Sequence, residues 1–258
     1  MTTTDWRTFW EKRSTEVGSD FEFDRVSACD DADVEELAKL ELLRFIDPQK
    51  EDIVFDAGCG TGGNMLMLSP QVNRILGIDY SAGAVERCRN RLKASRVQNA
   101  EVNHGDVTKL EISNCSIDKV ICMSVLQYLD NRDAEVALSE FARVLKPGGI
   151  LILHVKNLSS LYLSTLFVAQ QIRSKLGRSV RKANFRTFGW YVKNLRSLRF
   201  KITDYNSFNL AAIPKMPLRL ERYLRGVELR NCDGRVMRSS VIRRFGADLK
   251  IKAVLQKP

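Results

Sequence analysis

The chain has 258 residues, of which 44% are hydrophobic and 28% charged, and this composition excludes a globally disordered protein. No apolar run approaches the roughly 20 residues that cross a bilayer, and the polar start does not resemble a secretory signal peptide. The six cysteines form no CxxC pair, so we expect reduced core thiols in a cytoplasmic protein.

The net charge of +10 is spread unevenly along the chain. Residues 1–155 contain 18 Lys and Arg against 26 Asp and Glu, whereas residues 156–245 contain 20 against four. A strongly basic second part indicates contact with something anionic, or a solvated face with general affinity for polyanions.

The first elements in chain order are a cap and a helix. Residues 1–34 mix aromatic with polar side chains and predict an N-terminal cap segment. Leucines at near-helical spacing then predict a helix over residues 33–45, which Asp47-Pro48 ends.

Strands and helices alternate from there to about residue 155. Short apolar runs without in–out alternation predict strands that are covered on both faces, at residues 53–55, 75–78, 120–123 and 150–155. A third strand is expected to end at Asp106, and the fourth to run over residues 117–123. Apolar residues at helical spacing predict helices at residues 63–68, 82–94 and 133–145. The alternation predicts an α/β fold with a doubly wound sheet, and its core spans residues 35–156.

The rhythm changes after Lys156. Residues 157–199 are expected to form a basic helical lid insertion, with helices at 158–176 and 187–198. Residues 200–258 are expected to complete the sheet with strands at 200–208 and 248–255, around a basic helical insertion at about 210–245 that includes a helix at 216–224.

A glycine-rich loop gives the sharpest chemical signal. A buried strand ends at Asp56, and the run Gly58-Cys59-Gly60-Thr61-Gly62-Gly63 opens a helix. Glycines are needed there because a Cβ would block the approach of a nucleoside to the backbone. The loop also fits the dinucleotide-binding pattern, so by itself it leaves a nicotinamide-dependent enzyme open.

The surroundings of the loop are more specific. Asp79 ends the second strand about twenty residues later, where a carboxylate can accept hydrogen bonds from two ribose hydroxyls. Asp106 ends the third strand, and Leu-Lys-Pro-Gly-Gly at residues 145–149 leads into the fifth. In this order these elements resemble the class I (Rossmann-like) S-adenosylmethionine-dependent methyltransferases. The resemblance covers residues 35–155 and implies a seven-stranded, mostly parallel sheet with helices on both faces and S-adenosyl-L-methionine as cofactor.

The resemblance also implies roles for individual residues. The methionine and ribose end of the cofactor would lie against Asp56, Ala57, Gly58, Cys59 and Gly60. Asp79 would bind the ribose hydroxyls and Tyr80 would flank the adenine, although Asp79 could instead cap the following helix. Asp106 and Val107 would hold the adenine edge, and Met123 and Ser124 would lie beneath the sulfonium.

Methyl transfer requires alignment of an acceptor and, for a hydroxyl, removal of a proton. His154 is the candidate base, because the end of the fifth strand should lie near the reactive end of the cofactor; the alternative is a strand histidine that is merely hydrogen-bonded. Gln127, Tyr128 and Tyr191 are candidates for binding the acceptor.

No metal is expected, because Asp130, Asn131 and Asp133 are better explained as the start of a helix than as ligands. The fourth strand lacks the Asn/Asp-Pro-Pro-Tyr/Phe sequence that amino-methylating DNA and RNA enzymes of this fold carry after it. The sequence Ser-Val-Leu-Gln-Tyr-Leu at residues 124–129 looks more like the small-molecule branch.

The sequence therefore predicts a methyltransferase for a small-molecule acceptor, on a hydroxyl or carbon of a glycan, lipid-linked, isoprenoid or polyketide-type molecule with an anionic handle. The helix at 158–176, followed by Arg178, Arg181, Lys182 and Arg186, could grip that handle or rest on an anionic membrane surface. Two other classes stay open: an RNA methyltransferase that uses the basic segment, against which the lack of an RNA-binding appendage argues, and a non-catalytic cofactor-binding scaffold. The oligomeric state is left open.

Overall fold

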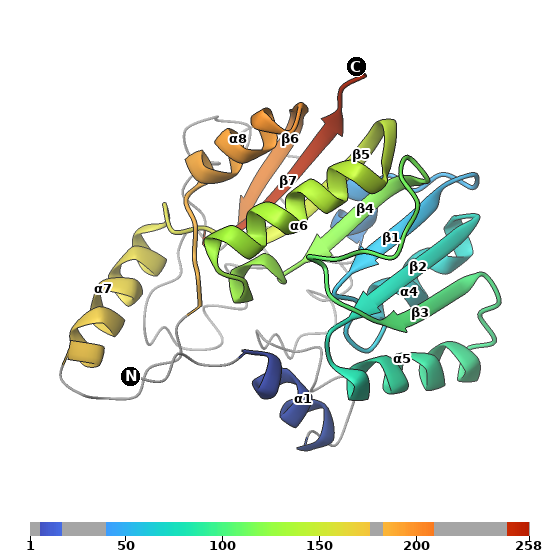
Figure 1. Cartoon of the computed structure of the whole chain (residues 1–258), viewed down its shortest axis with the longest axis horizontal. Coiled ribbons are helices and arrows are strands. Elements are labelled where there is room, and N and C mark those ends of the chain that lie inside the picture. Colours follow the sequence, from blue (N-terminus) through green and yellow to red (C-terminus); the bar gives the residue numbers. More distant parts are fainter. Residues whose placement is uncertain (1–5, 17–39, 176–182, 209–246, 258) are drawn as a thin grey trace.

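The computed structural model describes residues 6–16, 40–175, 183–208 and 247–257 (Figure 1). Within these ranges residues 40–46 are helical, which agrees with the later part of the helix expected at 33–45. The helix expected at residues 216–224 lies outside the described residues.

Seven strands form one sheet in the order β3-β2-β1-β4-β5-β7-β6 (Figure 1). Neighbouring strands are parallel except where β7 is involved, because β7 runs antiparallel to both β5 and β6. The strands are β1 Ile53–Ala57, β2 Arg74–Asp79, β3 Ala100–His104, β4 Ile117–Met123, β5 Leu145–Lys156, β6 Phe200–Phe208 and β7 Asp248–Leu255. This arrangement confirms the mostly parallel, doubly wound α/β sheet.

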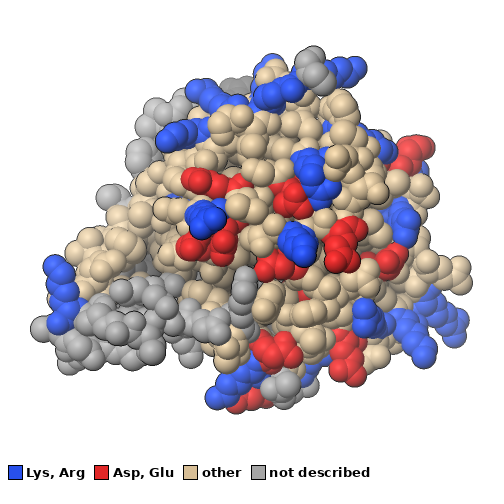
Figure 2. Space-filling view, viewed as in Figure 1, with Lys and Arg blue, Asp and Glu red and all other residues tan. Residues whose placement is uncertain are grey.

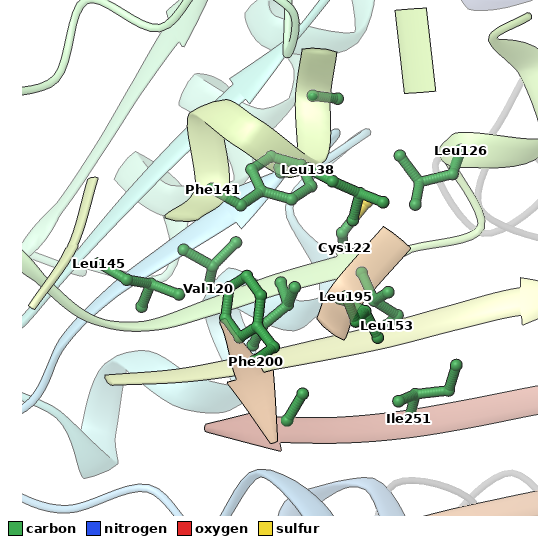
Figure 3. Close-up of a cluster of buried hydrophobic side chains, with 14 of the residues drawn as sticks. Val120, Cys122, Leu126, Leu138, Phe141, Leu145, Leu153, Leu195, Phe200 and Ile251 are labelled. Atoms are coloured by element: carbon green, nitrogen blue, oxygen red, sulfur yellow. The ribbon is translucent and has the colours of Figure 1, made fainter. Parts of the chain in front are cut away.

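Helices cover both faces of the sheet because adjacent side chains of its central strands point in opposite directions. Val54 and Phe55 of β1 are both fully buried, yet they belong to different apolar clusters. The cluster around Phe55 packs the sheet against α6 (Asn131–Val144) and α8 (Phe188–Ser197), and it includes Phe141 of α6 and Leu195 of α8 (Figure 3). α8 confirms the helix expected at 187–198.

The cluster around Val54 fills the opposite face. It joins the sheet to α4 (Gly63–Leu68), to α5 (Ala82–Ala94) and to the helix at residues 40–46. Met65 of α4 and Cys88 of α5 are both fully buried in it. α4 and α5 have the bounds that the apolar spacing predicts.

α6 begins where the sequence offers a capping side chain. Asp130 Oδ1 accepts a hydrogen bond from Asp133 N (2.8 Å), which satisfies one of the free N–H groups of the first turn. The interpretation of Asp130 as a helix cap is therefore confirmed. Among the described residues, no group of three or more His, Cys, Asp or Glu side chains could hold a metal ion.

The segment between β5 and α8 leaves the sheet and returns to the same place. Leu158 N donates to the carbonyl oxygen of Arg186 (2.9 Å), and α7 (Leu161–Lys175) lies between these two residues in the chain. α7 is the helix expected at 158–176. None of the helices in the described ranges has both the length and the apolar composition that crossing a membrane requires.

Arg186 is 4% exposed, and every N–H group of its guanidinium is hydrogen-bonded within the protein. Its five N–H groups donate, at 2.7–3.2 Å, to Asn131 Oδ1 and to the carbonyl oxygens of Leu126, Asn184, Leu129 and Asp130. The interpretation of Arg186 as part of an anion-gripping cluster is therefore wrong, because no N–H group is left for a ligand. Arg186 instead ties the returning chain to the segment that follows β4.

α1 (Trp6–Glu16) lies at the carboxyl edge of the sheet (Figure 1). The rings of Trp6 and Trp10 lie 4.8 and 5.3 Å from the ring of Tyr128, which follows β4. A Cβ built on Gly83, at the start of α5, would lie 2.3 Å from Ser14 Oγ. α1 therefore packs closely against both α5 and the segment after β4.

Candidate active site

The loop that follows β1 is shaped by glycines. The N–H groups of Gly58 and Cys59 both donate to the carbonyl oxygen of Ile78 in β2, at 2.9 Å each. Gly58, Gly60 and Gly62 have φ angles of 82, 55 and 85°, in the left-handed region that side chains disfavour. The chain thus turns from β1 into α4 while it stays hydrogen-bonded to β2.

Two of these glycines also make room for side chains of neighbouring elements. A Cβ built on Gly58 would lie 2.2 Å from Val125 Cγ2, and one built on Gly62 would lie 2.5 Å from Cys88 Sγ. The side chains of Val125 and Cys88 therefore fill the space that a Cβ would take at these two glycines. We call this loop, residues 58–63, the glycine cradle, because four of its six residues are glycines that leave its backbone without a Cβ.

Asp79, the last residue of β2, is held by backbone N–H groups. Its Oδ2 accepts from Gly60 N and its Oδ1 from Ser81 N, at 2.9 Å each. Burial raises the pKa of Asp79, and these two hydrogen bonds oppose that shift. Each carboxylate oxygen has a further lone pair, so the geometry fits acceptance of two ribose hydroxyls.

The residues expected around the adenine lie at the ends of β2 and β3. Tyr80 is 42% exposed, and its carbonyl oxygen lies 2.8 Å from Nε2 of His104. β3 ends at His104, so Asp106 belongs to the following loop, where its Oδ1 accepts from the N–H and hydroxyl groups of Thr108 (2.9 and 2.7 Å). Val107 is buried in the core behind it. Tyr80 thus offers an exposed ring, while Asp106 also stabilises a turn.

The expected cofactor residues at the end of β1 are buried. Asp56 and Ala57 are fully buried, and Cys59 is 5% exposed. A hydrogen bond with Cys88 and burial together raise the pKa of the Cys59 thiol well above its ordinary value. Because the side chains of Ala57 and Cys59 point into the core, a ligand could reach these two residues only through their backbone.

Ser124 and His154 come together at the carboxyl ends of β4 and β5. Ser124 N donates to the carbonyl oxygen of His154 (2.8 Å), and Ser124 Oγ lies 3.0 Å from His154 Nδ1. Ser124 has a φ of 61°, a left-handed conformation that costs a non-glycine residue about 1–2 kcal/mol. Met123, beside it, pairs with His154 in the sheet. The sequence indicates Ser124 and His154 as separate candidates, and the structure brings their side chains into contact.

Asp248 is the residue of this region that the sequence did not indicate. It begins β7, is 6% exposed, and its Oδ1 lies 3.4 Å from His154 Nε2 and 2.5 Å from Lys156 Nζ. Burial raises the pKa of Asp248, but the contact with His154 and the charge of Lys156 outweigh burial and hold that pKa well below its ordinary value. Only the antiparallel pairing of β5 with β7 could have revealed this contact.

The three residues expected to bind the acceptor lie in two places. Gln127 and Tyr128 follow β4, where the carbonyl oxygen of Gln127 accepts from Asn184 N (2.8 Å) and burial raises the pKa of Tyr128. Tyr191 is fully buried in the cluster between the sheet and α8, and burial raises its pKa to about 12. The structure thus brings Gln127 and Tyr128 to the carboxyl edge and places Tyr191 in the core.

Comparison with known proteins agrees with this geometry. Residues 54–149 match the family described as the methyltransferase domain. Carboxy-S-adenosyl-L-methionine synthase from Klebsiella pneumoniae is 34% identical over 118 residues, which cover 44% of this chain and 46% of that protein. The chain thus matches about half the length of this curated relative.

Solved structures match over nearly the whole chain. Geranyl diphosphate C-methyltransferase from Streptomyces coelicolor gives a TM-score of 0.64 at 14% identity and covers 98% of both chains. A chain from the complex of the Haloferax volcanii Trm112 methyltransferase activator with a putative methyltransferase gives 0.64 at 18% identity, over 96% of this chain and 98% of that one. At these identities the likeness shows the fold. The family match identifies residues 54–149 as a methyltransferase domain.

Proposed function

We propose that this chain is an S-adenosylmethionine-dependent methyltransferase that acts on a small molecule. The observation that carries the proposal is the hydrogen bond from Gly60 N to Asp79 Oδ2 (2.9 Å). It joins the glycine cradle and the ribose-binding acid into one unit inside the methyltransferase domain. A glycine-rich loop beside a half-buried carboxylate is what a nucleoside with two free hydroxyls requires.

S-adenosylmethionine supplies a methyl group that is already activated on a sulfonium. The chain's part is to hold and align. The backbone of residues 58–60 would face the methionine and ribose, Asp79 the ribose hydroxyls, and Tyr80 and Asp106 the adenine. Met123 and Ser124 end β4 beside this cradle, where the methyl group and the acceptor would meet.

We propose a hydroxyl or carbon of a glycan, lipid-linked, isoprenoid or polyketide-type molecule as the acceptor, with an anionic group as its handle. Gln127 and Tyr128 would contact it, because they follow β4 directly. Support comes from the Streptomyces relative, whose structure contains geranyl diphosphate, an isoprenoid diphosphate. α1 and α7 lie on the side of the sheet where the parallel strands end (Figure 1), so they would flank an acceptor bound there.

A peripheral contact with an anionic membrane is the finer part of this proposal and rests on α7. Val168 and Ile172 lie one turn apart on α7 and are 56% and 55% exposed, and Lys175 ends the helix. Binding to phosphatidylcholine vesicles with and without phosphatidylserine tests it. Binding that needs phosphatidylserine and is lost in V168D/I172D supports the contact; equal binding of the variant contradicts it.

An RNA substrate is the main alternative within enzymes. Figure 2 shows acidic side chains among the basic ones across the face that carries α6, so the described residues of this face form no continuous basic surface. A scaffold that binds the cofactor without transferring its methyl group is the alternative from another class. Both an enzyme and such a scaffold would use the cradle and Asp79 to bind the cofactor, so only transfer of the methyl group distinguishes them.

The test is transfer of labelled methyl from S-adenosylmethionine into a native cell extract that is then separated into lipid, metabolite, RNA and protein fractions. Label in the lipid or metabolite fraction, absent with D79A, supports the proposal. Label in RNA would overturn the acceptor class, and cofactor binding without label in any fraction would favour the scaffold. Mass spectrometry of the spent cofactor adds a check, because methyl transfer leaves S-adenosylhomocysteine whereas chemistry on the cofactor itself leaves a modified sulfonium.

A further inference from the structure

We propose that Ser124, His154 and Asp248 form a relay that takes the proton from a hydroxyl acceptor, with Asp248 as the positioning residue. The reaction rests on the proposed function, whereas the side-chain geometry stands independently of it. The inference narrows the acceptor to an oxygen and gives a role to the start of β7.

The relay is built by three neighbouring strands. Ser124 follows β4, His154 lies in β5 and Asp248 begins β7, which pairs with β5. Nδ1 of His154 faces Ser124 Oγ at 3.0 Å, and its Nε2 faces Asp248 Oδ1 at 3.4 Å. Both ring nitrogens of the histidine are therefore engaged, each by a different strand.

The charge of Asp248 selects one tautomer of the imidazole. Lys156 Nζ lies 2.5 Å from Asp248 Oδ1, and this contact favours the ionised carboxylate. A carboxylate facing Nε2 favours a proton on that nitrogen, because a lone pair there would meet a negative charge. Nδ1 is then the acceptor, so the hydroxyl of Ser124 donates to it.

The other charges near His154 are already paired. Lys250 lies opposite His154 in the pairing of β5 with β7, is 7% exposed, and forms an ion pair with Glu41. Among the described residues, the charged groups that face the imidazole from β5 and β7 are thus Lys156, Asp248 and Lys250. The positive charges of Lys156 and Lys250 are balanced by the negative charges of Asp248 and Glu41. An imidazolium formed at His154 would therefore still have the carboxylate of Asp248 beside it.

Proton removal follows from this arrangement. The oxygen of the acceptor would donate its proton to Ser124 Oγ while the Ser124 hydroxyl passes its own proton to His154 Nδ1. The new oxygen–carbon bond forms as the methyl–sulfur bond breaks, and the electron pair of that bond neutralises the sulfonium. Serine is unchanged, the histidine becomes an imidazolium beside Asp248, and its proton later goes to water.

The backbone of Ser124 supports a functional role. Its left-handed φ of 61° is costly for a serine, yet two contacts with His154 hold it there. This conformation brings the Ser124 hydroxyl to His154 Nδ1 just after the end of β4. The next residue, Val125, packs against Gly58 of the glycine cradle, so Ser124 lies near the cradle.

Nitrogen-15 NMR of the histidine side chains tests the geometry without any acceptor. The chain has two histidines, so the signals of His154 in the protein saturated with S-adenosylhomocysteine are assigned by comparison with H104Q. We expect the neutral ring to carry its proton on Nε2. In D248N the asparagine can turn an N–H toward Nε2, so the proton should move to Nδ1. A wild-type proton on Nδ1 would overturn the relay.

Activity gives the second readout. D248N and S124A should each lower methyl incorporation into the metabolite fraction by about a hundredfold or more, and D248N should leave the affinity for S-adenosylmethionine by calorimetry unchanged. D118N is the matched control for D248N, because Asp118 also lies on a strand and pairs with a lysine, Lys146, at 2.8 Å. S139A on the exposed side of α6 is the control for S124A.

The outcomes separate the two proposals. Absence of S-adenosylmethionine binding to the wild-type protein would overturn the proposed function and the reaction of the relay with it. Normal binding and transfer, with D248N and S124A as active as their controls, would overturn the relay alone. If D248N does not fold, the tautomer of His154 in the wild-type protein and the activity of S124A still test the relay.

Discussion

Gly58 lies so close to Val125 that a Cβ built on the glycine would come within 2.2 Å of Val125 Cγ2. The two residues belong to the loops after β1 and β4, which are adjacent strands of the sheet. Their contact sets the spacing between the glycine cradle and the relay residue Ser124.

Replacing Gly58 with alanine should therefore destabilise the protein for two reasons that can be separated. Gly148 has a similar φ of 87° but nothing within 4 Å of a built Cβ, so G148A should cost only the left-handed conformation, about 1–2 kcal/mol. G58A should cost a further 1–3 kcal/mol or so from overpacking. Urea denaturation measures both, and G58A/V125A should recover the overpacking part. Equal losses in G58A and G148A would contradict the close contact.

Removing the carboxylate of Asp79 should weaken cofactor binding. D79A is expected to reduce affinity for S-adenosylmethionine by about 1.5–3 kcal/mol, or roughly ten- to a hundredfold, by isothermal titration calorimetry. E101A removes the same charge from an exposed position on the adjacent strand β3 and should bind normally. Because burial raises the pKa of Asp79, affinity should also fall as the pH is lowered toward that raised value. Unchanged binding by D79A would contradict its assigned role.

Arg186 should contribute strongly to stability although it lies in a basic stretch. Lysine cannot reproduce a fork of five hydrogen bonds, so R186K should lower the free energy of unfolding by roughly 3 kcal/mol or more. R196K, on the exposed side of α8, makes the same exchange and should change stability by less than about 0.5 kcal/mol. Similar unfolding midpoints for both variants would show that the buried guanidinium is dispensable.

The depressed pKa of Asp248 predicts an acid-sensitive part of the stability. Its contribution is present above the ordinary aspartate pKa of about 3.9 and is lost as the pH falls through the lower pKa of the folded state. The free energy of unfolding of D248N should consequently depend less on pH below about 4 than that of the wild-type protein. Urea titrations across that range measure the difference; parallel curves would contradict the assignment.

The sequence was sufficient for the sheet because its central strands are apolar on both faces. In β4, Val120 and Cys122 face one apolar cluster and Ile121 faces the other. Such a strand belongs in the centre of a sheet that helices cover on both faces. The same local logic located the glycine loop and Asp79, since the loop, the strand and the acid are close along the chain.

Contacts between distant segments escaped this logic. Asp248 reaches His154 only because β7 pairs antiparallel with β5, and nothing near Asp248 in the sequence marks it. The sequence places Arg186 in a run of basic residues, and nothing near it in the sequence indicates that its side chain is buried and hydrogen-bonded to carbonyl oxygens. Tyr191 was expected near the acceptor, yet it lies on the core side of α8, which the helix register decides.

α7 belongs to a segment of the chain whose two ends, at Leu158 and Arg186, are joined by a backbone hydrogen bond. The chain leaves the sheet after β5 and returns where Leu158 N donates to the Arg186 carbonyl oxygen, so this hydrogen bond closes the excursion next to the sheet. Lengthening such a closed excursion costs only about 0.6 kcal/mol per doubling. We therefore expect changes in the length of the chain between these two residues to leave the methyltransferase domain at residues 54–149 folded.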